Sequence, residues 1–132
     1  MVQVWDVETG HCTETLRDHT DEVLDVCFSP SGLLVCTASA DGQAFVYDTA
    51  DWDIVAHLTG HEDEISAVRF NPQGTKILTV SSDKTARLWD AFQGTCLQVL
   101  EGHTGELFAG TFNYDGDTII TGGKDNTCRL WR

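Results

Sequence analysis

The chain has 132 residues, of which 41% are hydrophobic and 22% charged, a composition typical of an ordinary globular protein. Its 8 Lys and Arg residues stand against 21 Asp and Glu residues, so the formal net charge is −13. Nucleic acids and anionic membranes bind through clustered Lys and Arg, and this balance argues against both as partners.

In chain order, the sequence divides into a short leading segment and three units of one pattern. Residues 1–17 predict the end of a preceding unit, 18–59 and 60–101 predict two complete units, and 102–132 predict a third that lacks its last strand. The units share a period of 42 residues, which indicates a repeat architecture. An aromatic residue marks this period at Trp5, Tyr47, Trp89 and Trp131.

The middle unit shows how each unit is built. Short β-like segments are expected at residues 65–70, 76–81, 85–90 and 96–101. Turn-forming residues separate them, as in the Asn-Pro-Gln-Gly run that begins at Asn71. Helical periodicity is missing from the unit. The sequence therefore predicts an all-β chain with four strands in each complete unit.

A 42-residue unit with Gly-His near its start and Trp-Asp at its end resembles the WD-repeat β-propeller family. The likeness covers the whole chain and is best in the second unit. The first unit departs with Asp18-His19 and Tyr47, and the third ends in Trp131-Arg132. The resemblance implies about three four-stranded blades that together form one partial propeller domain.

The resemblance also implies a structural role for the recurring polar residues. In WD repeats, the His, Thr, Asp and Trp of one unit form a hydrogen-bonded tetrad that holds the strands of a blade together. The chemistry is suitable, because a carboxylate accepts from a His ring, a Thr hydroxyl binds the same ring, and an indole N–H adds a donor. Tyr47 can donate only through its hydroxyl, from a different point. By position, the implied sets are His19, Thr37, Asp41 and Tyr47; His61, Thr79, Asp83 and Trp89; and His103, Thr121, Asp125 and Trp131.

Enzymatic and metal-binding interpretations are disfavoured by spacing. A Thr-His-Asp set could suggest a hydrolase, but it occurs three times at one interval, as structural repeats do, and no Gly-x-Ser-x-Gly motif is present. The His and Cys residues lack metal-ligand spacing, apart from the adjacent pair His11 and Cys12. We therefore predict no catalytic residue, cofactor or metal.

Acidic residues gather near the His-bearing loops. These loops and the Asp-bearing turns must lie on one face, since each His has to reach its Asp. That face would also carry Asp18 and the basic Lys84 and Lys124. Its acids are either a solvated rim or a docking surface for a basic partner. Trp52 is predicted to be exposed on the opposite face. The predicted partner-binding residues, called the acidic rim below, are Asp21, Glu22, Glu62, Asp63, Glu64 and Glu106.

The C-terminal third carries a more specific resemblance. The segments SSDKTARLWD, GTCLQVLEGHT and FNYDGDTIITGGKDNTCRLWR resemble the final repeats of the WD-repeat dynein assembly factors. This likeness implies a non-catalytic adaptor that links outer-arm dynein to intraflagellar transport, with subunits of both as protein partners. It also implies a place in the cytoplasm and in the cilium or flagellum and its base. A WD-repeat subunit that recognises basic peptides, such as a histone tail or a degradation signal, is the alternative.

Two further expectations concern the compartment and the state of the chain. Five cysteines without a C-x-x-C pair favour a reducing cytosol, and apolar runs of at most four residues predict neither a membrane span nor a signal peptide. Propellers have about 4 to 8 blades, so we expect a C-terminal piece of a longer protein, with Met1 inside a blade. An open arc would expose apolar faces and strand edges, and the isolated piece is expected to self-associate.

Overall fold

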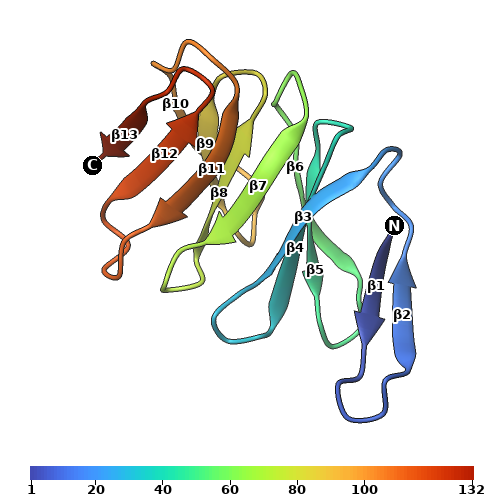
Figure 1. Ribbon diagram of the computed structural model, residues 1–132. Helices are drawn as coiled ribbons and strands as arrows, with labels where there is room; N and C mark the ends of the chain where they lie inside the picture. Colours follow the sequence, from blue (N-terminus) through green and yellow to red (C-terminus); the bar gives the residue numbers. More distant parts are fainter.

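The computed structural model describes residues 1–132 and contains only short strands joined by turns (Figure 1). The strands are β1 (Val2–Trp5), β2 (Cys12–Leu16), β3 (Val23–Phe28), β4 (Leu34–Ser39), β5 (Ala44–Asp48), β6 (Ile54–Leu58), β7 (Ile65–Phe70), β8 (Lys76–Ser81), β9 (Ala86–Asp90), β10 (Cys96–Leu100), β11 (Leu107–Phe112), β12 (Ile119–Gly123) and β13 (Cys128–Trp131). The predicted all-β class with four strands per complete unit is confirmed. No segment forms a helix of the length and apolar character needed to cross a membrane.

The strands form four separate antiparallel sheets. β1 and β2 make a leading hairpin, β3 to β6 the first blade, β7 to β10 the second blade, and β11 to β13 a three-stranded third blade. Within each blade the strands pair in sequence order, and the first strand carries the same bulge near its start. The first strands pack against one another, β3 on β7 and β7 on β11, so the blades follow one another along an arc (Figure 1).

The hydrophobic core lies between blades rather than within them. One cluster joins the first and second blades and includes Cys36, Val68 and Trp89, and another joins the second and third. A smaller cluster lies under the leading hairpin. Each blade therefore depends on its neighbours for burial, as expected for a repeat protein.

Side chains at equivalent positions of the two blade interfaces are matched in size. The second blade presents Val68 to the first blade, where the small Cys36 and Ala38 belong to the same cluster. The third blade has Gly110 at the position of Val68. A Cβ atom on Gly110 would lie 2.7 Å from Val80 Cγ1 of the second blade, so only glycine fits beside that larger side chain.

Candidate functional site

The second blade contains a complete hydrogen-bonded tetrad. The indole N–H of Trp89 donates to the Thr79 hydroxyl oxygen at 2.8 Å. His61 Nε2 lies 2.7 Å from that oxygen, and His61 Nδ1 lies 2.8 Å from Asp83 Oδ2. Strands β8 and β9 supply Thr79 and Trp89, while His61 lies in the loop before β7 and Asp83 in the turn after β8. The chain of bonds thus links both connections at one end of the blade to its central strands.

Donor and acceptor roles in this tetrad follow from its chemistry. The Asp83 carboxylate can only accept, so His61 Nδ1 donates and His61 Nε2 accepts from the Thr79 hydroxyl. Burial lowers the pKa of His61 against the opposing effect of Asp83, which favours this neutral ring. Burial also favours neutral Asp83, but hydrogen bonds from Thr85 and His61 outweigh it and lower the pKa of Asp83.

The third blade repeats this arrangement with its own residues. His103 Nδ1 lies 2.9 Å from Asp125 Oδ2, and His103 Nε2 lies 2.7 Å from the Thr121 hydroxyl. The Trp131 indole N–H donates to the same hydroxyl at 2.9 Å. The structure therefore brings together all members of the second and third predicted sets.

The first blade is different at its aromatic member. His19 contacts Asp41 and Thr37 at 2.9 and 2.7 Å, but the Tyr47 hydroxyl donates to Asp18 Oδ2 at 2.9 Å, whereas the Trp89 indole N–H donates to Thr79. Burial and the Asp18 carboxylate together raise the pKa of Tyr47. Asp18, which is not a member of the predicted set, is thus the hydrogen-bond partner of Tyr47.

The Asp18 and Tyr47 departures from the repeat pattern compensate for each other. Asp18 stands where the second unit has Gly60, and a Cβ atom on Gly60 would lie 3.5 Å from Trp89 Cη2 and in collision with Arg87. The first blade has Phe45 in place of Arg87 and Tyr47 in place of Trp89. The side chain of Asp18 therefore has both room and a partner. Two departures within one unit were the signal that could have revealed this pair.

The tetrad also fixes the loops that carry the acidic rim. The backbone N–H groups of Thr20, Glu62 and Thr104 donate to Asp41, Asp83 and Asp125 at 3.0 to 3.2 Å. In the first two blades, a serine hydroxyl at the end of the second strand adds a bond of 2.8 Å to the carbonyl of Glu22 or Glu64. The rim loops are therefore held at a defined height above the blades.

The acidic rim is concentrated on two neighbouring loops. Asp21, Glu22, Glu62, Asp63 and Glu64 are exposed on the loops before β3 and β7. Glu106, in the third blade, is half-buried and contributes less to this surface. None of the six carboxylates belongs to an ion pair; the pairs in the structure are the three His–Asp contacts and Arg69 with Asp25. The rim is thus a fixed acidic surface whose carboxylates are not neutralised by ion pairs within the chain.

The tetrad hydroxyls have no free capacity for nucleophilic chemistry. Thr79 is fully buried and already bonded to His61 and Trp89. No group of three or more His, Cys, Asp or Glu side chains is arranged to hold a metal ion. Positioning of loops, rather than bond making, is what this geometry supports.

Trp52 is not the exposed residue that the sequence predicts. It lies in the β5–β6 turn, at the end of the blade away from the acidic rim, but its side chain is half-buried and packs against the cluster of Leu16, Phe45 and Tyr47. Its backbone has a φ of 62°, where the equivalent residues are Gly10 and Gly94. The period alone could have indicated this unusual turn, though not the packing of the indole.

Comparison with known proteins shows three repeats with the same spacing of 42 residues. The WD domain, G-beta repeat model matches residues 10–48, 52–90 and 94–132. WD repeat and SOCS box-containing protein 1 of Takifugu rubripes is 43% identical over 51 residues, or 38% of this chain and 12% of that protein. Nuclear distribution protein PAC1 of Arthroderma otae is 40% identical over 47 residues, or 36% of this chain and 10% of that protein.

These matches span only about a tenth of the length of the curated relatives. The family model, in contrast, covers nearly the whole chain in three consecutive matches. With its four-stranded sheets and repeated His-Thr-Asp-Trp sets, the chain belongs to the WD-repeat (WD domain, G-beta repeat) family.

Proposed function

We propose that the chain is a non-catalytic interaction scaffold whose acidic rim docks a basic partner protein. WD-repeat proteins act as protein-interaction scaffolds. The observation that supports this use of the rim is a set of exposed carboxylates, without ion-pair partners, on loops held by the tetrads. A basic surface would supply ion-pair partners for these carboxylates.

Fixed charges of one sign favour recognition in two ways. They accelerate encounter with an oppositely charged partner and disfavour wrong ones, while adding less to affinity itself. Because the rim loops are already ordered, docking costs little further loop entropy. Exposed charges are screened beyond about 8 Å at physiological ionic strength, so capture through the rim should weaken as salt rises.

The partners we propose are outer-arm dynein components and intraflagellar transport subunits, with the chain as their adaptor in the cytoplasm and at the cilium or flagellum. The support for this is the likeness of residues 76–132 to WD-repeat dynein assembly factors. A basic peptide such as a histone tail or a degradation signal would suit the same acidic rim, and it is the competing proposal.

Charge reversal on the rim tests the proposal. The Glu62 and Glu64 side chains are exposed and make no hydrogen bonds, so Glu62→Lys with Glu64→Lys should leave the loop backbone in place. Recovery of dynein-arm or transport subunits from ciliary extract by this immobilised variant should fall several-fold at low salt. Glu8→Lys with Glu14→Lys changes net charge equally on the leading hairpin, away from the rim, and should retain capture.

Undiminished recovery by the rim variant, at both low and moderate salt, would refute docking through the rim. Retention of histone-tail peptides but not of dynein or transport subunits by the unmodified chain would favour the competing proposal.

A further inference from the structure

A groove of about 260 Å³ lies between the first and second blades, at the end of the blades away from the acidic rim. It is lined by the β3–β4 turn of the first blade and by the β7–β8 and β9–β10 turns of the second. Figure 1 shows the β3–β4 and β7–β8 turns at the lower end of these blades, and a Cβ atom on Gly74 would lie 3.5 Å from Pro30 Cδ across them. Both blades have all four strands, so a complete blade bounds the groove on each side.

Two large apolar side chains that line this groove are open to solvent. Leu33, at the end of the β3–β4 turn, is 66% exposed, and Phe92, in the β9–β10 turn, is 58% exposed. The groove is also lined by Leu34, which is buried in the core cluster shared by the two blades. Apolar surface is therefore continuous here from the core to the solvent.

The other units have no comparable side chain at these two positions. Their residues are Thr75 and Asp117 at the position of Leu33, and Glu8 and Ala50 at the position of Phe92. The same turns thus form with small or polar residues, and the fold itself does not require a large apolar group at either place. Contiguous apolar groups that a fold leaves in water are a mark of interaction surfaces.

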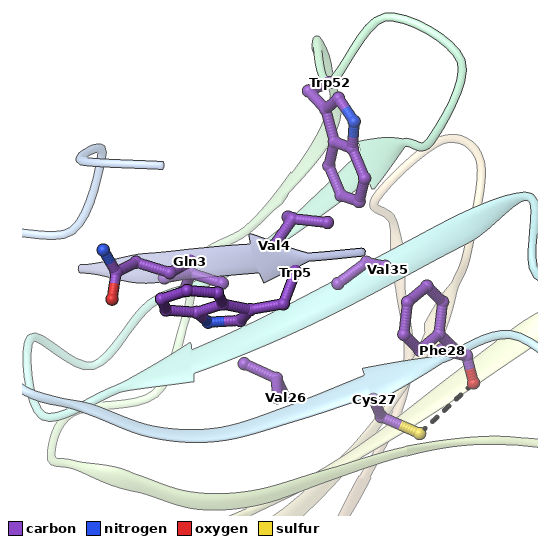
Figure 2. Close-up of a pocket in the computed structure, with 9 residues that line it drawn as sticks. Gln3, Val4, Trp5, Val26, Cys27, Phe28, Val35 and Trp52 are labelled. Carbon is purple, nitrogen blue, oxygen red and sulfur yellow. Dashed lines mark hydrogen bonds between the residues drawn. The ribbon is translucent and has the colours of Figure 1, made fainter. Parts of the chain in front are cut away.

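Trp52 shows that an aromatic residue of such a turn can be covered by the chain itself. It lies in the β5–β6 turn, and Figure 2 shows its ring directed toward Val4 and Val35. Its side chain is half-buried. Phe92, in the corresponding β9–β10 turn, keeps more than half of its surface in solvent beside Leu33. Another molecule would be needed to cover it.

Hydrogen bonds fix the turns that carry Leu33 and Phe92. The Leu33 carbonyl accepts from the Thr49 backbone N–H at 3.0 Å and from the Thr49 hydroxyl at 3.2 Å. Asp90 Oδ1 accepts from the backbone N–H groups of Phe92 and Gln93 at 2.9 and 2.8 Å. Because both turns are already ordered, an occupant of the groove would lose little affinity to loop entropy.

Asp48 determines the charge of the groove. It is the only charged residue in the lining, and no ion pair within the chain includes it. Asp48 Oδ1 accepts from the Ala50 backbone N–H at 2.8 Å, whereas Oδ2 makes no hydrogen bond within the chain. An arginine or lysine of an occupant can therefore bind Oδ2. An acidic occupant would be repelled by Asp48 and by the net charge of −13.

We propose that this groove docks a short segment of a partner protein in which one leucine-sized aliphatic side chain stands beside an arginine or lysine. The aliphatic side chain packs against Leu33 and Phe92, and the cation binds Asp48. The volume suits one anchoring side chain, since small-molecule pockets are larger, at roughly 300–1,000 Å³. The groove and the acidic rim lie at opposite ends of the blades, so this docking site does not rest on the function proposed above.

Peptide titration of the isotope-labelled full chain, followed in amide NMR spectra, tests the proposal. The probes are capped, glycine-flanked peptides that carry one Leu and one Arg, separated by zero to three glycines. We expect at least one of them to shift the amide signals of Leu33, Gln73 and Phe92, which line the groove. Replacing the Leu of that peptide by Ala, or its Arg by Glu, should raise the dissociation constant at least fivefold.

Variants taken from the chain's own repeat test the groove residues. Leu33→Thr and Phe92→Ala introduce residues that other units carry at those positions, so the turns should stay folded, as the dispersion of the spectra would show. Each variant should raise the dissociation constant of the Leu-Arg peptide at least fivefold. Asp48→Asn keeps the Oδ1 acceptor but removes the charge, so the Arg and Glu forms of the peptide should then bind alike.

Two controls separate the groove from other surfaces. Leu97 is 46% exposed on the outer strand β10, outside the groove, so Leu97→Ala should leave peptide binding unchanged. Glu62→Lys with Glu64→Lys, which tests the acidic rim, should leave it unchanged as well, so that failure of one proposal does not imply failure of the other.

Three results would overturn docking of such a segment at the groove. They are the absence of shifts at these amides with every peptide, equal binding of the Leu and Ala peptides, and equal weakening by Phe92→Ala and Leu97→Ala. Shifts of Leu33 and Phe92 that follow protein concentration without any peptide would assign the groove to a second copy of the chain, and would overturn the proposal too.

Discussion

Replacing Asp83 by alanine should destabilise the protein far more than replacing a neighbouring rim acid. Asp83 accepts from His61 Nδ1 at 2.8 Å and from the Thr85 backbone N–H at 2.9 Å. The His61 side chain is 0% exposed, so its ring N–H would lose its partner away from water. A buried unpaired donor costs about 1–3 kcal/mol, and with the half-buried Thr85 amide the loss is about 2–4 kcal/mol.

Thermal unfolding converts this energy into a measurable shift. At about 2.1 cal/mol/K per residue, unfolding entropy is roughly 0.28 kcal/mol/K for a chain of this size, so 3 kcal/mol lowers Tm by about 11 °C. Glu62→Ala removes an exposed side chain without hydrogen bonds and should shift Tm by about 2 °C or less. Both variants are compared at one protein concentration, because association also affects Tm. Equal shifts for the two variants would refute the view of Asp83 as the anchor of a buried network.

Other predictions concern pH, packing and the first blade. Burial lowers the pKa of His61 below its ordinary 6.5, so the unfolded chain binds a proton at this ring more readily than the folded chain does. The free energy of unfolding should therefore fall as pH drops through 6.5. Urea titrations should show a weaker pH dependence of that free energy in His61→Gln. Gly110→Val should lower the free energy of unfolding by about 1–3 kcal/mol, because the new side chain would crowd Val80. Ala109→Val is the control on the same strand: its side chain is exposed, so the urea midpoint should change little. Tyr47→Phe should cost about 0.5–1.5 kcal/mol, the usual net value of one hydrogen bond. It should have no further effect once Asp18 is changed to Ala, which removes the acceptor; additive losses in that double-mutant cycle would contradict the Tyr47–Asp18 pairing.

The repeat period made most of the fold predictable from sequence. Turn residues and a constant interval indicated the strands of the middle unit to within one residue, and only the start of β9 and the end of β10 differ. The His, Thr, Asp and Trp residues of the second and third blades lie in contact for the same reason. Every unit places them on the same strands and turns, so spacing along the chain corresponds to position in the blade.

Features that depend on neighbouring blades were harder to predict. The ion pair between Arg69 and Asp25 joins two blades, and the equivalent positions in the other units carry no charged residue. The half-burial of Glu106 and the packing of Trp52 likewise depend on which side chains stand opposite them. Sequence spacing places a residue on its own blade, but it does not show what the adjacent blade presents.

The matched side-chain sizes at the two blade interfaces bear on how the repeats find their order during folding. Blades of one pattern could in principle dock out of sequence, a characteristic failure of repeat proteins. Here the third blade placed on the first would leave a void where Gly110 met Ala38, and a second blade placed on another second blade would press Val68 against Val80. Each interface thus fits only one of the other blades. Gene duplication of the second unit alone would create that clash, so lengthening this array would require a compensating change at Val68 or Val80.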